Sequence, residues 1–420
     1  MKIVAGLDFG TSNSALAITR DDKTQVLRIN NRESAERTLR SVIHIDEDRT
    51  IEVGQRAIDQ YIEFQGLSGR FLQSIKAFLP QSTFAETRIF GRRYELEDLV
   101  AIILREIKSL GENALHLPLE EIIMGRPVLF SEDTEKDALA ERRLRTAAER
   151  AGFKSVQFEL EPIAATLAYR STLTPSEQKI VLMGDFGGGT SDFCVMSVDG
   201  KTLTQTERRK SVLSTGGVYI GGDTFDKRIM WEKVTPHFGR DVTWRGLTGN
   251  QLEMPVHLVR SICEWHQIPF MRDRATLATI RDVKRTASNP GLVANLENLI
   301  LENKGFMVFQ AIERAKKELA TESEATINYT DRDIIINEKV TRGEFEGMIR
   351  DDLEAIKACV SDTLQKAGAT EQDIDMVLLT GGSSFIPAVQ RIFTERFGEV
   401  KLLQMDAFTS VAQGLALSGT

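Results

Sequence analysis

One pattern occurs twice in this chain, with a whole domain's length of sequence between the two copies. Residues 3–18 read IVAGLDFGTSNSALAI, and residues 181–196 read VLMGDFGGGTSDFCVM. Each copy has an apolar run typical of a buried strand, then Asp-Phe-Gly, a turn of small residues, and a second apolar run. Repeats so far apart are typical of two similar domains, whereas a solenoid repeats at short intervals. The chain is therefore expected to contain two related halves.

Strands and helices alternate through the remainder of the sequence, which predicts an α/β fold. The stretch 173–179 is polar and contains Pro175, so it is the candidate boundary between the two halves. Residues 226–330 hold all three tryptophans and are predicted to be mostly helical. Apolar runs typical of buried strands lie at 3–7, 14–19, 121–129, 180–184 and 376–379, and helical spacing of apolar residues lies at 98–110, 134–151, 161–169 and 306–320.

Composition and charge narrow the functional classes. The chain has 420 residues, of which 41% are hydrophobic and 27% charged, and its formal net charge is -8. These values are those of a globular protein with an ordinary core. There is no dense run of Lys and Arg, so a nucleic-acid partner is not expected. The sequence contains no uninterrupted apolar stretch of about 18 residues, so no membrane span is predicted.

The cysteines and the first residues indicate a compartment. Cys194, Cys263 and Cys359 are odd in number and widely spaced, so they indicate no disulfide framework. This favours a reducing environment. The N-terminal apolar run is broken by Asp8, unlike the apolar segment of a signal peptide. A cytoplasmic location without membrane contact is therefore predicted.

The two hairpins have the chemistry of a phosphate cradle. Glycines and small hydroxyl residues let backbone N–H groups approach phosphate oxygens closely. Asp8 and Asp185 stand at strand ends, where carboxylates can hold Mg²⁺ through its waters. A single Asp-x-Gly after a strand is usually an ordinary turn, but here there are two matching copies and a third glycine turn at 378–387. Since neither a P-loop nor a dinucleotide fingerprint is present, the cradle belongs to another class.

Six segments together resemble one known family, the DnaK-type (seventy-kilodalton heat-shock) chaperones of the actin-like ATPase superfamily. They stand in the family's order and span nearly the whole chain. The ERAKK helix distinguishes this family from the related sugar kinases. The segments are DFGTSNS at 8–14, DFGGGTSD at 185–192, GGDTFDKR at 221–228, IERAKKELA at 312–320, TGGSSFIPAVQ at 380–390 and VAQGLAL at 411–417.

The resemblance implies an actin-like ATPase fold with two similar domains, built on duplicated ribonuclease-H-like cores around a nucleotide cleft. Each domain would carry an inserted subdomain. Domain I would be 1–178, with a core of 1–38 and 115–178 and an insertion at about 39–114. Domain II would be 179–420, with a core of 179–223 and 349–420 and an enlarged helical insertion at about 224–348.

The resemblance also implies roles for individual residues, with ATP or ADP and Mg²⁺ as cofactors and K⁺ as a further ion that the family allows. The catalytic and metal-binding set would be Asp8, Lys76, Glu161, Asp185 and Asp192, with Asp8, Asp185 and Glu161 holding Mg²⁺ largely through water and Lys76 placing the attacking water. The phosphate contacts would be Gly10, Thr11, Ser12, Asn13, Gly187, Gly188, Gly189, Thr190 and Gly222. The adenosine contacts would be Glu313, Lys316, Lys317, Gly381, Gly382, Ser383 and Phe385.

Several positions depart from the family's pattern. Phe385 stands where the family has an arginine that stacks on adenine, Lys317 replaces an arginine, and Ala320 replaces a serine. Arginine and lysine are not equivalent at a stacked site, so adenine preference is less secure than phosphate binding. The segment between Phe225 and Glu313 is longer than in the family. It contains His257, Cys263 and His266, whose spacing matches no strong zinc pattern.

The chain stops at Thr420, directly after the segment that matches the family's closing helix, which predicts a member consisting of the ATPase domain alone. The first functional hypothesis is a slow ATPase that closes its domains on ATP and signals to an unidentified protein partner. The alternatives are a metabolite kinase of the same superfamily, a filament-forming protein, and a nucleotide-binding interaction module without turnover. No additional sugar-pocket motif supports the kinase.

Overall fold

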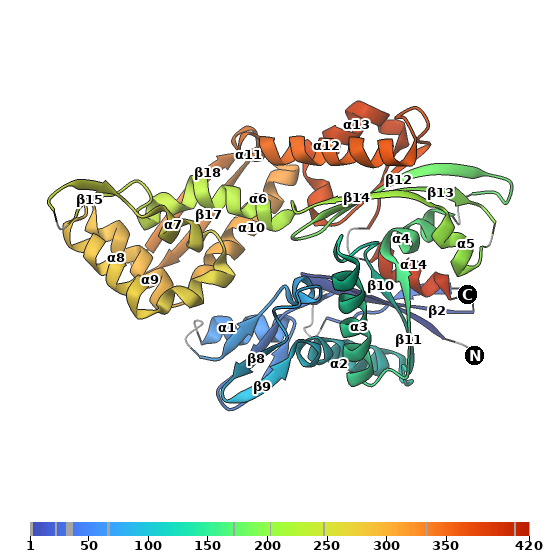
Figure 1. The fold of residues 1–420 in the computed structure, drawn as a ribbon, viewed down its shortest axis with the longest axis horizontal. Helices are drawn as coiled ribbons and strands as arrows, with labels where there is room; N and C mark the ends of the chain where they lie inside the picture. The colour runs from blue at the N-terminus through green and yellow to red at the C-terminus, as the bar shows by residue number, and fades with distance from the viewer. Residues whose placement is uncertain are drawn as a thin grey trace. The chain divides into compact units, whose positions relative to one another are not determined.

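The computed structural model describes residues 3–21, 23–30, 37–64, 68–170, 173–201, 203–246, 248–332, 334–406 and 409–419. The chain divides into two compact units. Unit 1 comprises Met1–Tyr61, Gly69–Gly221 and Ala355–Thr420, and unit 2 comprises Ile62–Ser68 and Gly222–Glu354. Figure 1 labels the elements of both units along the chain.

The first sheet of unit 1 is built around the N-terminal hairpin. Its strands lie in the order β11-β10-β1-β2-β3, and β4 also pairs with β2. The hairpin β1–β2 is antiparallel, whereas β1–β10 and β10–β11 are parallel. The strands are β1 (Val4–Phe9), β2 (Asn13–Arg20), β3 (Lys23–Val26), β4 (Leu39–Arg40), β10 (Glu121–Arg126) and β11 (Ser155–Leu160).

The second sheet of unit 1 repeats this plan from residue 178 onward. Its order is β14-β13-β12-β19-β20, with an antiparallel hairpin β12–β13 and parallel pairs β12–β19 and β19–β20. A hairpin, a third antiparallel strand and two parallel strands therefore recur in the same order. The repeat predicted from the sequence is confirmed as two sheets of one topology. The strands are β12 (Gln178–Phe186), β13 (Ser191–Asp199), β14 (Val212–Val218), β19 (Met376–Thr380) and β20 (Leu402–Gln404).

Two helices, α4 (Glu161–Arg170) and α14 (Ser410–Ser418), join the sheets through one apolar core. In this core Ile163 and Ala164 of α4 and Leu415 of α14 pack with Ile123 of the first sheet and Met183 of the second. The two helices cross at backbone contact. A Cβ at Gly414 would lie 1.6 Å from the carbonyl oxygen of Ala164, so only glycine fits at this crossing.

Further helices cover the sheets of unit 1. The core of the first sheet includes residues of α2 and α3, such as Leu104 and Leu144. The Phe393 ring of α13 packs on Phe186 and Phe193 of the second sheet, with ring centroids 6.0 and 6.3 Å away. The helices are α1 (Gln55–Glu63), α2 (Leu96–Leu115), α3 (Thr134–Arg150), α5 (Gln205–Lys210), α12 (Arg350–Ala367, in unit 1 from Ala355) and α13 (Pro387–Phe397).

Smaller elements complete unit 1. A three-stranded sheet has the order β6-β5-β7, and β8 and β9 form a separate hairpin. Short 3-10 turns follow β7 and flank α13. The bounds are β5 (Ile43–Ile45), β6 (Ile51–Val53), β7 (Arg70–Leu72), η1 (Ile75–Phe78), β8 (Glu86–Ile89), β9 (Arg92–Glu95), η5 (Gly382–Phe385) and η6 (Glu399–Lys401).

Unit 2 is mainly helical and contains two strand hairpins, β15–β16 and β17–β18. Its interior includes Phe225 packed edge-on against Phe345, with ring centroids 6.3 Å apart. The elements are α6 (Gly222–Ile229), η2 (Met230–Val234), η3 (Thr235–Phe238), β15 (Thr243–Arg245), β16 (Gln251–Glu253), α7 (Val256–Ile262), η4 (Trp265–Arg272), α8 (Arg274–Thr286), α9 (Pro290–Leu301), α10 (Gly305–Thr321), β17 (Glu324–Asp331), β18 (Ile334–Thr341) and α11 (Arg342–Met348).

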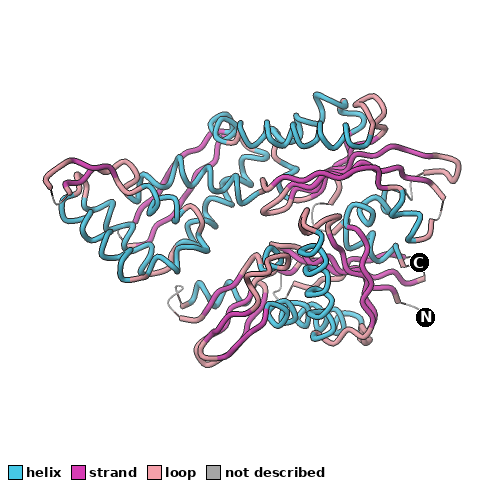
Figure 2. Tube along the Cα trace, in the orientation of Figure 1, coloured by secondary structure: helices cyan, strands magenta, loops and turns pink. Residues whose placement is uncertain are grey.

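The predicted strands and helices are present, and their ends differ in ways that have local causes (Figure 2). The helix expected at 98–110 starts at Leu96, because a capping box between Glu95 and Asp98 satisfies its first N–H groups. The strand expected at 180–184 runs on through Phe186, because its pairing with β13 continues to Ser191. The predicted domain boundary after residue 178 stays a prediction.

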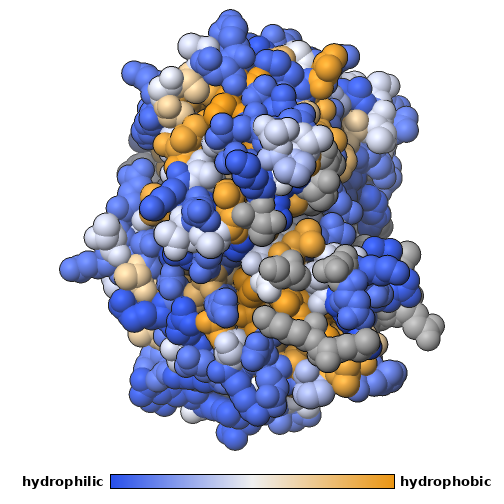
Figure 3. Space-filling model, turned by 90° about the vertical axis from the view of Figure 1, so that its right-hand side faces the viewer, coloured by the Kyte–Doolittle hydropathy of each residue, from blue (hydrophilic) through white to orange (hydrophobic). Residues whose placement is uncertain are grey.

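The described residues contain no helix that is both long and apolar enough to cross a membrane. On the face drawn in Figure 3, hydrophilic side chains predominate and hydrophobic ones show in small groups.

Candidate functional site

Five charged side chains meet in unit 1, near the ends of the two hairpins. Asp8 lies on β1, and Asp185 and Asp192 face each other across the hairpin β12–β13. Lys76 belongs to η1, and Glu161 is the first residue of α4. Each of these groups acts electrostatically on others in the set, so the structure brings together all five residues of the predicted catalytic set.

Lys76 and Glu161 form a direct ion pair. The Lys76 Nζ donates to Glu161 Oε1 at 2.9 Å, and the two side chains are only 12% and 13% exposed. Lys76 reaches this position from a tight turn that begins at Ser74, whose φ of 53° is left-handed. Water is largely excluded from the pair, so the attraction is stronger than it would be on the surface.

The cluster contains four carboxyl groups and one lysine, and this excess of negative charge shifts the pKa values of its members. Burial first, and then the charge of Glu161, raise the pKa of Asp8 to about 7, although Lys76 opposes the shift. Burial lowers the pKa of Lys76, but the charges of Glu161 and Asp8 raise it further, so its net shift is upward. Lys76 is therefore held as an ammonium group.

The two aspartates of the second hairpin respond in the same direction. Burial, followed by the charges of Glu161, Asp192 and Asp8, raises the pKa of Asp185 well above its usual value. Burial also raises the pKa of Asp192 to about 6, although a hydrogen bond from Thr190 Oγ1 at 2.8 Å lowers it. Asp8, Glu161 and Asp185 are half-buried, whereas Asp192 is more exposed. These four carboxyl groups share one lysine, an arrangement that a further cation would stabilise.

The donor set fits Mg²⁺ held through water. Carboxylate oxygens are the ligands that Mg²⁺ prefers, and this ion usually keeps several of its waters. Among the described residues, no three acidic, histidine or cysteine side chains stand close enough to bind one ion together. Asp8, Asp185 and Glu161 are the residues that could hold such an ion through its water shell.

The first hairpin turn places backbone groups beside Asp8. A Cβ at Gly10 would lie 2.2 Å from the carbonyl oxygen of Asn13, so the turn from Gly10 to Asn13 closes only around glycine. The carbonyl of Ser12 accepts a hydrogen bond from Ser41 N at 3.0 Å, which fixes the turn from outside. Thr11 and Ser12 are half-buried and lie in this turn, as predicted from the sequence.

The second hairpin turn is equally tight. Gly187 N donates to Thr190 O at 2.9 Å, and Gly188 and Gly189 lie between them. A Cβ at Gly221 would lie 2.5 Å from the carbonyl oxygen of Gly188, so the segment leading to α6 packs closely on this turn. Backbone N–H groups of a glycine turn can approach an anion without steric hindrance.

The third glycine turn of the sequence follows β19, the strand parallel to β12. Gly381 has a φ of 85°, and a Cβ there would lie 2.2 Å from the carbonyl oxygen of Phe186, so the turn rests on the end of β12. Ser383 and Ser384 are buried, and Ser384 Oγ bonds to Gly381 O at 2.6 Å. Phe385, 43% exposed, is the side chain that this turn presents most openly.

The predicted adenosine helix is α10, in unit 2. Lys316 Nζ donates to Asp226 Oδ2 at 2.8 Å and to the carbonyl of Gly222 at 2.9 Å, and its side chain is 11% exposed. Its ammonium group is therefore engaged by the protein. Lys317 pairs with Glu313 at 2.8 Å and is largely exposed, so it can change partner more readily.

The sequence did not reveal two residues that hold predicted site residues in place, one in each unit. Arg143 of α3 is 7% exposed and donates to the carbonyls of Leu79, Gln81 and Phe84, each at 3.0 Å. It thereby anchors the chain that follows Lys76. The signal available in the sequence was the position of this arginine among the alanines of the buried face of α3. The second residue is Asp226, the buried partner of Lys316.

Comparisons with known proteins identify the family of the chain. The family model described as Hsp70 protein matches residues 4–244 and 305–420. Chaperone protein DnaK of Thermotoga neapolitana is 27% identical over an alignment of 423 positions, which covers 99% of this chain and 59% of that protein. The protein of the same name from Thermosipho melanesiensis is 27% identical over 420 residues, 99% of this chain and 58% of that protein.

The chain therefore spans less than two thirds of the length of these curated relatives. The range left unmatched by the family model, 245–304, falls in unit 2. It lies within the stretch between Phe225 and Glu313 that the sequence predicts to be longer than usual.

Proposed function

The chain belongs to the Hsp70 family, which has the actin-like ATPase fold, and on this premise we propose that it binds ATP with Mg²⁺ and hydrolyses it slowly to ADP and phosphate. The observation that carries the proposal is the cluster of four interacting carboxyls and one lysine beside two matching glycine turns. Phosphoryl transfer needs positioning and charge neutralisation more than covalent chemistry, and this group offers both.

The residues of unit 1 divide the work among them. Backbone N–H groups of the turns at Gly10–Asn13 and Gly187–Thr190 would hold the β- and γ-phosphates. Lys76 would orient the attacking water and stabilise charge on the transferred group, while Glu161 keeps the ammonium in place at 2.9 Å. Mg²⁺ supplies charge neutralisation on the phosphates when it is bound through Asp8 and Asp185.

Coupling to a protein partner, by closure of the two domains on ATP, is part of the same proposal, as is a cytoplasmic location. Its support is family membership and the names of the relatives, which are chaperones. Because the chain matches only 59% of such a relative, the chaperone activity of the whole relative enters here as a proposal.

Calorimetric titration of the purified chain with ATP and with ADP, each with and without Mg²⁺, tests the binding step. We expect binding that depends on the metal. Phosphate release without any acceptor tests hydrolysis and separates an ATPase from a metabolite kinase, which would need its acceptor. An absence of nucleotide binding under all four conditions would refute the proposal. Binding without phosphate release would leave an interaction module in its place.

A further inference from the structure

Helix α5 covers the open edge of the first sheet, although it belongs to the connection between two strands of the second sheet. The edge strand is β11, whose other neighbour is β10. The Phe158 carbonyl of β11 accepts hydrogen bonds from Gln205 Nε2 at 2.9 Å and from Arg209 Nη2 at 3.1 Å. Side chains of α5 thus satisfy backbone groups that an edge strand would otherwise expose.

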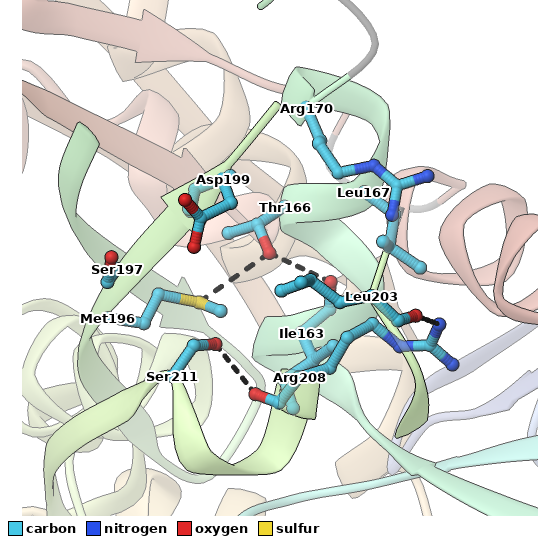
Figure 4. A pocket seen from close by; sticks show the side chains of 11 residues that line it. Ile163, Thr166, Leu167, Arg170, Met196, Ser197, Asp199, Leu203, Arg208 and Ser211 are labelled. Carbon is cyan, nitrogen blue, oxygen red and sulfur yellow. Dashed lines mark hydrogen bonds between the residues drawn. The ribbon is translucent and has the colours of Figure 1, made fainter. Parts of the chain in front are cut away.

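Arg208 makes the most extensive contacts of this helix. Its Nη2 donates to Glu159 Oε2 at 3.1 Å and to the carbonyl of Ser418 at 3.0 Å. Its Nη1 donates to the carbonyl of Leu203 at 2.9 Å, the bond drawn in Figure 4. Because the guanidinium group is rigid and planar, these bonds fix three segments relative to one another.

The partner Glu159 is a buried charge. It is 1% exposed, and its second basic neighbour, Arg209, is 50% exposed and 4.0 Å away. Removing the partner of a buried charge is far more disruptive than removing an exposed ion pair, because the remaining charge has no solvent. Glu159 therefore depends on Arg208 for its compensation.

The position of Glu159 gives this dependence a functional meaning. Glu159 lies near the end of β11, two residues before Glu161, which pairs with Lys76. Ser418 ends α14, the helix that crosses α4. Arg208 thus ties the connection between β13 and β14 to the strand that delivers Glu161 and to the end of the crossing helix.

Arg208 also borders the region where α4 packs on the second sheet. A small cavity of about 20 Å³, room for roughly one water, lies beside Arg208. Figure 4 shows Ile163, Thr166 and Leu167 of α4 along one side of it and Met196 of β13 on another. The guanidinium of Arg208 thus stands at the edge of the contact between α4 and the second sheet.

We propose that Arg208 is a positioning residue for Glu161, acting through the buried carboxylate of Glu159. The inference rests on the proposed ATP hydrolysis and adds to it a control point outside the nucleotide site. A misplacement of about 1 Å can reduce a catalysed rate on the order of a hundredfold. Loss of Arg208 should therefore reduce turnover while the glycine turns continue to bind phosphates.

The test compares R208A, E159Q and the double variant E159Q/R208A, with Lys210→Ala on the same helix as the matched control. For R208A we expect a kcat lower by tenfold or more, with the Kd for Mg·ATP changed less than threefold. The double variant should regain most of the rate, because a neutral glutamine needs no buried counter-charge. A merely structural role for Arg208 would instead lower the Tm of R208A and the fraction of active protein, and would leave the kcat per nucleotide-binding molecule unchanged. R208K, which keeps the charge but not the planar fork, provides a variant less prone to misfold and should be intermediate.

Unchanged kcat in R208A, or a double variant no faster than R208A, would overturn the inference. If the unmodified chain binds Mg·ATP without turnover, the hydrolysis proposal fails separately. The ratio of the Kd values for ADP and ATP then becomes the readout, because only ATP carries the γ-phosphate that would lie beside Lys76 and Glu161 in the proposed site. That ratio must fall in R208A and recover in the double variant, and equal ratios would refute the positioning role. A chain that binds no nucleotide would remove both proposals.

Discussion

The crossing of α4 and α14 makes a strong prediction about Gly414. A Cβ added at this residue would lie 1.6 Å from the carbonyl oxygen and 2.3 Å from the carbonyl carbon of Ala164, whereas ordinary contacts of a Cβ are 3.4–4 Å. Both contacts are with helix backbone, which cannot rotate away as a side chain can. The helices must therefore separate in Gly414→Ala, which opens the apolar core around Ile163 and Leu415.

The size of the effect follows from two opposing terms. Replacing glycine by alanine inside a helix normally gains about 1 kcal/mol. Overpacking of a well-packed core costs about 1–3 kcal/mol, and occasionally more. Because the added Cβ would overlap backbone atoms by a large distance, the cost should lie at or above the upper end of this range. We expect a net loss of ~2 kcal/mol or more in the free energy of unfolding.

Thermal unfolding followed by far-UV circular dichroism measures the loss, which should lower Tm by several degrees. The control is Gly347→Ala in α11, where a Cβ meets nothing within 4 Å, and it should be neutral or slightly stabilising. Tryptophan fluorescence reports separately on the unfolding of unit 2, because all three tryptophans are in unit 2, whereas Gly414 is in unit 1. A Tm for Gly414→Ala equal to that of the unmodified chain would refute the close crossing of these helices.

Three further expectations concern other parts of the chain. Lys76→Ala should slow ATP hydrolysis on the order of a hundredfold and leave nucleotide binding largely intact, and equal turnover would remove Lys76 from the mechanism. Phe385→Ala should weaken ATP and GTP by the same factor, since base stacking is worth about 1–3 kcal/mol and is tolerant of the base; a selective loss of ATP would show that this ring discriminates. Burial raises the thiol pKa of Cys194 and of Cys263 to about 12, so neither should be alkylated in the native chain at pH 8.5, and labelling of either at that pH would contradict its burial.

The sequence predicted the duplicated sheets because the information is local. An apolar run, a glycine turn and a second apolar run specify a hairpin wherever they occur. The matching Asp-Phe-Gly motifs predicted that Asp8 and Asp185 lie at equivalent strand ends, and each is the penultimate residue of its strand, β1 and β12. The extent of the pairing was less predictable, because the ends of strands depend on partners that the local sequence does not name.

The residues that the sequence did not reveal act over long separations. Arg143 holds carbonyls about sixty positions earlier in the chain, and Glu159 is compensated by Arg208 on α5, about fifty positions later. From the sequence alone, a charged residue is expected at the surface, because the residue that compensates its charge when it is buried is not known. The same holds for Lys316, which the resemblance assigned to the nucleotide and the structure pairs with Asp226.

The residues proposed for phosphate chemistry and the helix assigned to the adenosine lie in different units. The five charged residues and all three glycine turns lie in unit 1, whereas the residues of α10 assigned to the adenosine lie in unit 2. Changes confined to unit 2 leave Lys76, Glu161 and their hydrogen bond intact, so they should alter nucleotide affinity and choice before they alter the rate of the bound nucleotide. We therefore expect substitutions within the segment 245–304, which lies outside the family match, to leave the proposed hydrolytic group intact, because none of its five charged residues lies in unit 2.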